Sequence, residues 1–270
     1  MSALTAQLSS FVNQSNALFA QAKERAQALP ANTVQVWPGG ATFNSIQAAI
    51  NSITNASPQV QYQVAVGSGT YNENVTMKDY VYIVGAEQDL TTITAPPQNT
   101  YNGVVNSASG CGISDVTINA PGGGWGSSPC GIKICGSGNF HIKGVTINCT
   151  DSGNEGNNVR AITNNTGSYA GNVVIGQSVI TVSGSSDTTA SGMEFFGMGG
   201  FTVFCNILAI EATGSSTYGV TTAVNATVTL DNSKIIANIW ALYNSDGTAL
   251  ITANQCTIQG PVSSGVVVNP

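Results

Sequence analysis

The spacing of apolar residues in this chain changes near residue 60. Before that point the spacing is helical: apolar side chains share one face over residues 3–29, which Pro30 ends, and again within residues 42–53, where Thr42 is the expected N-cap. After that point, apolar and polar residues alternate in short runs broken by Gly and Asn, which is the pattern of β-strands. The pattern predicts two N-terminal helices followed by an extended β-structure.

Two families of short apolar segments repeat in step through the β-rich part. Members of the first family have the order variable, small, apolar, variable, and begin at residues 102, 130, 157, 191, 218, 240 and 264, so that successive starts are 22 to 34 residues apart. A second family, which includes Ser114–Asn119, follows each of the first six members. Two strand families in phase at this period are typical of a parallel solenoid with one coil per repeat. Unrelated strands of a β-sandwich would not stay in step.

We therefore expect an all-β fold in which residues 31–270 form one single-stranded parallel β-helix domain. Asn and Gly between the strands suit the tight corners of such coils, because both residues tolerate a positive φ. Residues 1–30 are expected to form an amphipathic helix that caps the open end of the core or, through an exposed apolar face, joins copies of the chain into a homo-oligomer.

Residues 34–95 resemble a known family. Their segments TFNSIQAAINSI, YQVAVGSGTYNENVTMKDYVYIVG and TTITA are similar to the opening coils of pectin methylesterases and of the wider pectin-lyase-like superfamily of parallel β-helices. The resemblance implies a right-handed solenoid, with an acidic sugar polymer as the ligand on the outward face of a long parallel sheet. The superfamily contains esterases, lyases, glycosidases, tailspikes and adhesins, so the resemblance implies a fold more firmly than an activity.

Charge is scarce along the chain. Charged residues make up 7% of it, with 7 Lys plus Arg, 13 Asp plus Glu and a net charge of −6, which argues against nucleic acid as a partner. No apolar run is long enough for a membrane-spanning helix. The N-terminal residues lack the basic start and continuous apolar segment of a signal peptide, which predicts a cytoplasmic or non-classically exported protein if Met1 is native.

The six cysteines are too widely spread for a zinc site, and His141 is the single histidine. We therefore expect neither a metal nor a cofactor. Most of the cysteines are expected to be small buried apolar residues, and the alternative is one disulfide among Cys111, Cys130, Cys135 and Cys149.

One segment, Cys130–Gly136, contains a lysine between two isoleucines. If Ile132 and Ile134 face the core, Lys133 must face solvent, because successive side chains of a strand point to opposite sides. The same register in every repeat predicts one outward column whose neighbours are about 4.8 Å apart. Its members are Val105, Lys133, Arg160, Glu194, Thr221, Tyr243 and Val267.

Lys133, Arg160 and Glu194 are the candidate catalytic residues of this column. Two cations about 5 Å apart repel by roughly 3 kcal/mol at an effective dielectric constant near 20, so basic residues on successive coils require an explanation. Lysine and arginine together can hold a carboxylate, Lys133 can act as a base, and Glu194 can act as an acid, a second base or a nucleophile. The alternative is a solvent-exposed face on which Glu194 balances Arg160.

The resemblance also bears on Glu194. The stretch Met193–Gly197 is similar to the pectin methylesterase stretch that contains that family's first catalytic Asp, which places Glu194 at or beside the nucleophile position. The family's Gln-Asp-Thr-Leu stretch is missing, and no arginine follows Arg160. The ordinary esterase mechanism is therefore not expected.

Seven residues are candidates for substrate binding. They are Trp125, Trp240, Tyr243, Thr221, His141, Asp151 and Glu155. The aromatic residues can stack on sugar rings, and the two acidic residues belong to a loop that can overhang the column. The competing interpretations are packing of Trp240 at a corner, an ordinary hydrophilic loop, and a solvent-exposed or hydrogen-bonded histidine.

These observations favour an enzyme that acts on an acidic polysaccharide or another carboxylate-bearing substrate. The reaction would be pectinesterase-like hydrolysis or lyase-type proton abstraction. The competing class is a non-catalytic carbohydrate-binding or structural β-helix, such as an adhesin or tailspike, or a β-helix adapted to a substrate that is not a carbohydrate.

Overall fold

The computed structural model describes residues 32–39, 42–96, 102–122, 128–151, 158–164, 171–185, 188–196, 201–223, 225–245 and 247–270. The chain divides into two compact units, Met1–Thr33 and Val34–Pro270. The predicted helix over residues 1–30 lies outside the described residues, as do Trp125 and Glu155. Within the described ranges, no helix has the length and apolarity needed to cross a membrane.

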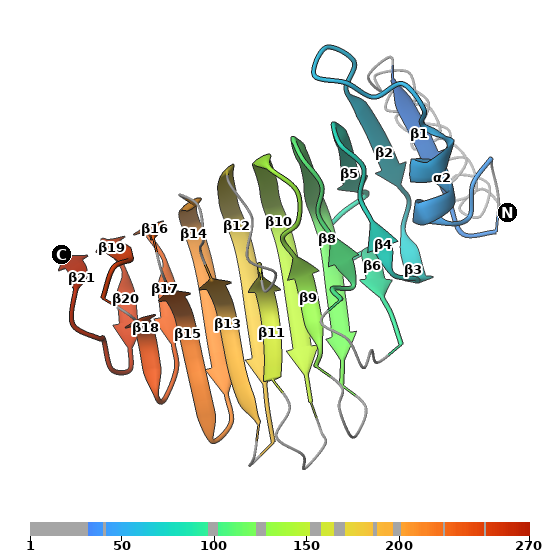
Figure 1. Cartoon of the computed structure of the whole chain (residues 1–270). Helices are drawn as coiled ribbons and strands as arrows, with labels where there is room; N and C mark the ends of the chain where they lie inside the picture. Colours follow the sequence, from blue (N-terminus) through green and yellow to red (C-terminus); the bar gives the residue numbers. More distant parts are fainter. Residues whose placement is uncertain are drawn as a thin grey trace, which may run out of the picture. The chain divides into compact units, whose positions relative to one another are not determined.

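Two β-sheets make up the described part of the second unit (Figure 1). The seven-stranded sheet contains β4 (Val75–Thr76), β7 (Val105–Asn106), β9 (Cys130–Lys133), β11 (Asn158–Thr163), β13 (Thr189–Phe196), β15 (Ser216–Ala223) and β18 (Trp240–Asn244). The 14-stranded sheet contains β1 (Thr33–Val36), β2 (Tyr62–Val66), β3 (Gly69–Asn72), β5 (Val81–Gly85), β6 (Thr91–Thr94), β8 (Cys111–Pro121), β10 (Gly138–Thr150), β12 (Gly171–Ser183), β14 (Phe201–Thr213), β16 (Ala226–Asp231), β17 (Lys234–Ile236), β19 (Leu250–Asn254), β20 (Thr257–Gln259) and β21 (Val266–Asn269).

The chain passes back and forth between the two sheets. From β7 to β19, each strand of the seven-stranded sheet is followed by a strand of the 14-stranded sheet, as β9 is by β10 and β11 by β12. The strand pairings from β2 to β21 within the described residues are parallel. Figure 1 shows the resulting stack of coils. The predicted all-β parallel solenoid is confirmed.

Alternation along the strands builds the core. In the 14-stranded sheet, one inward position is isoleucine on every coil from β6 to β20, and the register places these side chains directly above one another. The members of this stack are Ile93, Ile118, Ile147, Ile180, Ile210, Ile235 and Ile258. Burying each such side chain stabilises the fold by about 1.5–3 kcal/mol. The stack explains how a chain with few charges and short strands obtains a continuous core.

The 14-stranded sheet bends along a row of residues with left-handed backbone. The row consists of Asp115, Gly144, Gln177, Ile207, Asn232 and Gln255, whose φ values lie between 48° and 60°. Asn, Asp and Gly tolerate this conformation, whereas a β-branched residue is strained in it. Ile207 is therefore the outlier of the row. Ser178 and Ser233 accept hydrogen bonds from the backbone N–H groups of Val145 and Leu208 beside the bend, at 3.3 and 3.2 Å.

The second predicted helix exists, but it begins later than expected. Helix α2 spans Ile46–Ser52, and its N-cap is Ser45, not Thr42. The cause is Glu73, whose carboxylate accepts hydrogen bonds from the backbone N–H groups of Ile46 and Gln47 at 2.7 and 3.0 Å. These bonds satisfy two of the free N–H groups at the start of the helix. The helix packs its buried isoleucine and alanine side chains toward β2 and β4.

All six cysteines are free. The expectation that most of them are small buried residues is confirmed for Cys111, Cys130, Cys149 and Cys205. The alternative of a disulfide is wrong for this structure. Among the described residues, no group of His, Cys, Asp and Glu side chains could hold a metal ion.

Candidate functional site

The seven-stranded sheet departs from simple alternation in the middle of each coil. A Cβ atom added to Gly131 would lie 2.5 Å from Cγ2 of the core residue Ile147, so this position faces inward. Ile132 is fully buried and faces inward as well. Two consecutive inward residues place Cys130 and Lys133, three positions apart, on the same outward side.

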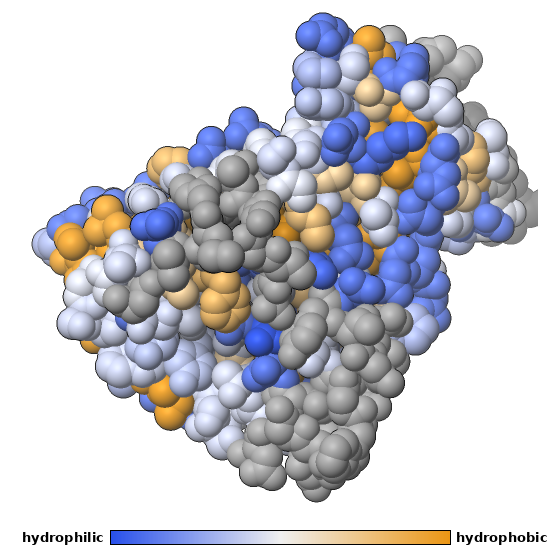
Figure 2. All heavy atoms as spheres, in the orientation of Figure 1, coloured by the Kyte–Doolittle hydropathy of each residue, from blue (hydrophilic) through white to orange (hydrophobic). Residues whose placement is uncertain are grey.

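This pattern produces two outward columns that run across the coils. The first column contains Cys130, Arg160, Ser191, Tyr218 and Trp240. The second contains Asn106, Lys133, Thr163, Glu194, Thr221 and Tyr243. We call the surface formed by these two columns the Glu194 face. Figure 2 shows hydrophilic side chains in the middle of this surface, over β9 and β11.

Arg160 does not occupy its predicted position. The register pairs Thr163 with both Lys133 and Glu194, whereas Arg160 pairs with Cys130 and Ser191. The prediction failed because it aligned the repeat on Asn158 as the small inward residue. Ala161, which is fully buried, has that role instead.

The two ends of the predicted column are also wrong. Val105 is fully buried and pairs with Ile132, so the outward residue of that coil is Asn106. Val267 pairs with Thr252 in the 14-stranded sheet and does not reach the Glu194 face. The predicted neighbours Thr221 and Tyr243 do continue the column beyond Glu194.

Arg160 and Glu194 nevertheless meet. Nε of Arg160 donates a hydrogen bond to Oε2 of Glu194 on the next coil, and the two side chains are only 10% and 14% exposed. The expected attraction between these residues is confirmed. Charge-assisted bonds of this kind are among the stronger hydrogen bonds in proteins, and largely buried ions need them to offset the loss of hydration.

Two threonine hydroxyls flank Glu194 on its own column. Thr163 lies on the preceding coil and Thr221 on the following one, and they are 1% and 8% exposed. Among the described residues, the buried hydroxyl groups without a hydrogen-bond partner are those of Thr163, Thr221 and Thr222. A buried hydroxyl that makes no hydrogen bond costs about 1–3 kcal/mol, so two such groups beside one carboxylate suggest a surface shaped for a ligand.

Lys133 lies two coils from Glu194, a separation of about 10 Å along the column at the usual strand spacing. Thr163 lies between them. Cys130 is beside this group, and burial raises the pKa of its thiol to about 12, although the Arg160 and Lys133 cations lower it in part. Cys130 therefore remains a thiol at neutral pH and is not a nucleophile.

Aromatic side chains continue the Glu194 face past Thr221. The rings of Trp240 and Tyr243 are stacked, with centroids 5.3 Å apart and an interplanar angle of 20°. Tyr218 lies 5.9 Å from Tyr243, centroid to centroid. All three residues are half-buried, so each packs on its neighbour and still presents surface outward.

The two other described candidates, Asp151 and His141, do not belong to the two columns. Asp151 is 5% exposed and accepts a hydrogen bond from Thr188 Oγ1 at 3.3 Å, so its side chain is buried. His141 is exposed on the 14-stranded sheet. Trp125 and Glu155 lie outside the described residues.

Sequence reasoning missed Thr163 and Tyr218. The signal that could have found them is the small inward residue of each coil: Gly131, Ala161 and Gly192 are equivalent positions at the centre of their coils. An alignment of the repeats on these small residues assigns Thr163 to the column of Lys133 and Tyr218 to the column of Arg160.

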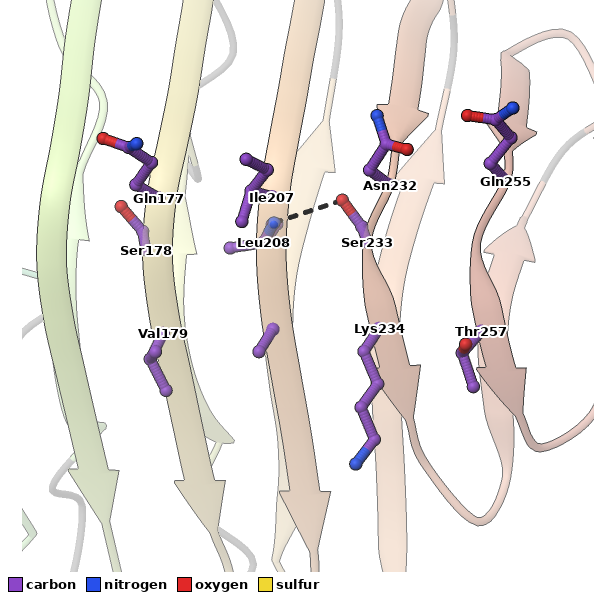
Figure 3. A pocket seen from close by; sticks show the side chains of 11 residues that line it. Gln177, Ser178, Val179, Ile207, Leu208, Asn232, Ser233, Lys234, Gln255 and Thr257 are labelled. Carbon is purple, nitrogen blue, oxygen red and sulfur yellow. Dashed lines mark hydrogen bonds between the residues drawn. The ribbon is translucent and has the colours of Figure 1, made fainter.

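A separate hollow of about 510 Å³ runs along the bend of the 14-stranded sheet. Figure 3 shows Gln177, Ile207, Asn232 and Gln255 in a row across neighbouring strands, with Leu208 N–H bonded to Ser233. Lys234 is the only charged group among its lining residues. This hollow therefore lacks the acid and base that catalysis requires, and the Glu194 face is the better candidate.

Comparison with solved structures identifies the fold. A pectin methylesterase in complex with a hexasaccharide aligns over 84% of this chain and 71% of its own, at 15% identity and a TM-score of 0.51. Pectin methylesterase PemA from Erwinia chrysanthemi aligns over 90% and 82%, at 14% identity and a TM-score of 0.49. The Aspergillus niger enzyme aligns over 88% of each chain, at 16% identity and a TM-score of 0.49.

The sequence matches no protein-family model, and no curated protein is similar to it in sequence. At such low identities the structural likeness establishes the fold alone. The chain has the pectin-lyase-like parallel β-helix fold, with structural similarity to pectin methylesterases.

Proposed function

We propose that the Glu194 face binds an acidic polysaccharide, or another carboxylate-bearing substrate, and hydrolyses a carboxylic ester in it. The observation that carries this proposal is the environment of Glu194. Its carboxylate is bonded to Arg160, and Glu194 lies on one column between Thr163 and Thr221, whose buried hydroxyls have no hydrogen-bond partner among the described residues. The pectin methylesterases of similar fold make a carbohydrate ester the first substrate to test.

In the proposed reaction Glu194 is the general base. The guanidinium of Arg160 orients its carboxylate. Glu194 takes a proton from a water molecule whose oxygen attacks the ester carbonyl, and it returns that proton to the departing alcohol. Lys133 and the hydroxyl of Thr163 donate hydrogen bonds to the carbonyl oxygen as it becomes negative. The products are an alcohol and a carboxylic acid, which releases its proton to water at neutral pH.

Charge and aromatic surface support an acidic carbohydrate as the substrate class. Lys133 and Arg160 carry two positive charges and Glu194 one negative charge, so these three residues leave a net charge of +1 on a protein whose total is −6. A positive patch on a negative protein attracts a carboxylate-bearing chain. Trp240 and Tyr243, at the far ends of the first and second columns, provide apolar ring surface for sugar rings on the same face.

A second candidate function is binding of the same polymer without turnover. One observation favours it: Glu194 is the only carboxylate on the described Glu194 face, and Arg160 already neutralises its charge. Hydrolases and lyases commonly use more than one titratable group. Under this alternative, Lys133, the threonines and the aromatic rings are contacts that hold the polymer.

The deciding experiment uses methyl-esterified and unesterified polygalacturonate with the full chain. Methanol release reports ester hydrolysis, and ultraviolet absorbance of unsaturated uronate reports lyase activity. We expect methanol release that falls by at least about 100-fold in Glu194→Gln, the scale of general-base catalysis. Lys234→Met, on the other sheet, is the control and should leave the rate unchanged.

Each other result has a meaning. Methanol release that is unaffected by Glu194→Gln would refute the role of Glu194. Unsaturated product in place of methanol would reassign the reaction to proton abstraction. Retention of the polymer without either product would favour the binding function.

We also infer two finer features of the fold. The coils are right-handed, the sense that nearly all crossover connections between parallel strands take. Helix α2 closes the N-terminal end of the core, which would explain why its isoleucine and alanine side chains are buried. A crystal structure of the chain tests both inferences.

A further inference from the structure

A hollow of about 530 Å³ lies on the 14-stranded sheet, apart from the Glu194 face. Its lining includes Asp79, Tyr80, Tyr82, Ser109, Asn139 and His141, and we call it the tyrosine hollow. Its volume is within the range of small-ligand sites. The residues that line it come from the starts of β5 and β10 and from the segments that precede β2, β5, β8 and β10.

Two glycines of one coil leave space in which two tyrosine rings of the preceding coil pack. A Cβ atom added to Gly110 would lie 2.7 Å from Cε1 of Tyr80, and one added to Gly112 would lie 3.0 Å from Cδ1 of Tyr82. Any larger residue at these positions would push the rings away. The rings therefore pack closely against the two glycines and form a platform that stays half-exposed.

Tyr80 also has a strained backbone. Its φ is 60°, a left-handed conformation that bulky residues rarely adopt. Strain of this kind gathers at ligand sites, where the surrounding structure holds a side chain in a required place. Here the conformation directs the ring of Tyr80 over Gly110.

Hydrogen bonds fix the polar groups around the platform. Asp79 Oδ1 accepts from the backbone N–H of Ser109 at 2.8 Å, and Ser109 Oγ accepts from the backbone N–H of Ser137 at 2.9 Å. Asn139 Oδ1 accepts from the Asn172 side chain at 3.1 Å, which directs its own amide N–H groups away from that contact.

Three polar side chains of the hollow remain available to a ligand. Within the described part of the chain, the hydroxyls of Tyr80 and Tyr82 and the imidazole of His141 make no hydrogen bond to protein. Tyr82, Gly112 and His141 are neighbours on the successive strands β5, β8 and β10. His141 is therefore on the strand that follows the one against which the Tyr82 ring packs.

The charge of the tyrosine hollow differs from that of the Glu194 face. Its lining contains the carboxylate of Asp79 and neither lysine nor arginine. A carboxylate-bearing sugar would meet a negative charge without a cation to offset it, whereas a neutral sugar can place its apolar face on the tyrosines and its hydroxyls on Asp79, Asn139 and His141.

We propose that the tyrosine hollow is a second carbohydrate-binding site that holds a neutral sugar residue of a glycan. The site acts independently of the Glu194 face, and it is independent of the function proposed above. With one site for neutral sugars and one for acidic sugars, the protein can hold a neutral part and an acidic part of a mixed polysaccharide.

The test measures binding of neutral hexasaccharides of β-linked glucose and of β-linked galactose by calorimetry and saturation-transfer NMR. Hexagalacturonate is the acidic comparator. The variants are Tyr80→Asn, in which asparagine tolerates the left-handed backbone, and Tyr82→Thr, in which threonine suits a strand. The matched control is Phe204→Thr, which removes a 49% exposed ring from the same sheet outside the hollow.

We expect the protein to bind at least one neutral hexasaccharide, and affinity to fall at least about 10-fold in Tyr80→Asn and in Tyr82→Thr. Phe204→Thr and Lys133→Ala should bind as the unmodified protein does. Failure of both neutral sugars to bind at about 10 mM, a very weak affinity, would overturn the proposal. The proposal would also be overturned if both tyrosine variants bound the neutral sugars as tightly as the unmodified protein does. The same holds if hexagalacturonate were the only sugar whose binding depended on the tyrosines. If Tyr80→Asn fails to fold, Tyr82→Thr decides.

Discussion

Nε of Arg160 donates a hydrogen bond to Oε2 of Glu194 on the next coil, although these residues occupy different columns of the sheet. The register pairs Arg160 with Ser191 and Glu194 with Thr163. The ion pair is thus diagonal, and it connects the two outward columns at the centre of the Glu194 face.

Breaking the Arg160–Glu194 pair on one side should destabilise the protein. Each of Arg160→Met and Glu194→Gln removes the bond between two largely buried charged groups, and we expect each to lower the free energy of unfolding by about 1–3 kcal/mol, less than for a fully buried pair. The double variant should lose less than the sum, because the same bond is lost in both single variants. Urea denaturation measures all three. If the loss of stability in the double variant equals the sum of the losses in the single variants, Arg160 and Glu194 are not energetically coupled.

Thr163→Val and Thr221→Val should separate stability from function. Each removes a buried hydroxyl that has no partner among the described residues, so we expect a gain of up to about 1 kcal/mol in the free energy of unfolding. Affinity for the polymer should fall, because the ligand loses a hydrogen bond.

Thr222→Val is the matched control for both threonine variants. Its hydroxyl is also buried and has no hydrogen-bond partner in the described part of the chain, but Thr222 pairs with Phe195, a core residue, and lies off the Glu194 column. Thermal denaturation should show a similar gain, and binding should be unchanged. If all three variants bind equally well, the threonines do not contact the ligand.

Ile207→Asn should stabilise the protein. Ile207 has a φ of 57° and is 54% exposed, so asparagine relieves backbone strain and sacrifices little buried surface. We expect a gain of about 0.5–1 kcal/mol by urea denaturation. Val179→Asn, at another exposed apolar position outside the left-handed row, should give no gain. A loss of stability in Ile207→Asn would mean that its side chain contributes more than the strain costs.

Stability should fall as pH rises from about 9 to about 12. Burial raises the pKa of the Cys111 and Cys130 thiols from 9.0 to about 12. Between these values the unfolded chain releases thiol protons that the folded chain retains, so rising pH favours unfolding. Urea denaturation at several pH values measures the slope, which should be shallower in Cys130→Ala. If the free energy of unfolding falls with pH equally steeply in the unmodified protein and in Cys130→Ala, Cys130 does not contribute to the pH dependence.

Much of the fold could be predicted because its signals are local. The isoleucine that recurs once per coil indicates a buried position, because side chains alternate along a strand, and the two strand families predict a parallel solenoid. Lys133 was expected to face outward for the same reason, since its neighbours Ile132 and Ile134 are both buried. The start of helix α2 was missed because Glu73, which is distant in sequence, completes the cap.

The candidate site could be predicted only in part. A shift of one coil against the next changes which residues become neighbours, and that shift depends on which small residue fits against the core. Ala161, not Asn158, fits there, and this moves Arg160 out of the Lys133 column and brings Thr163 into it. The contacts of Gly110 with Tyr80 and of Gly112 with Tyr82 are likewise contacts between residues of different coils.

The amino-acid order of this chain thus determines its strands, its solenoid and the outward direction of Lys133, because alternation acts between adjacent residues. Contacts between coils determine the ion pair of Glu194 and its two threonine neighbours. Those contacts depend on the packing of side chains about 30 residues apart, such as Arg160 and Glu194, and no local pattern specifies them.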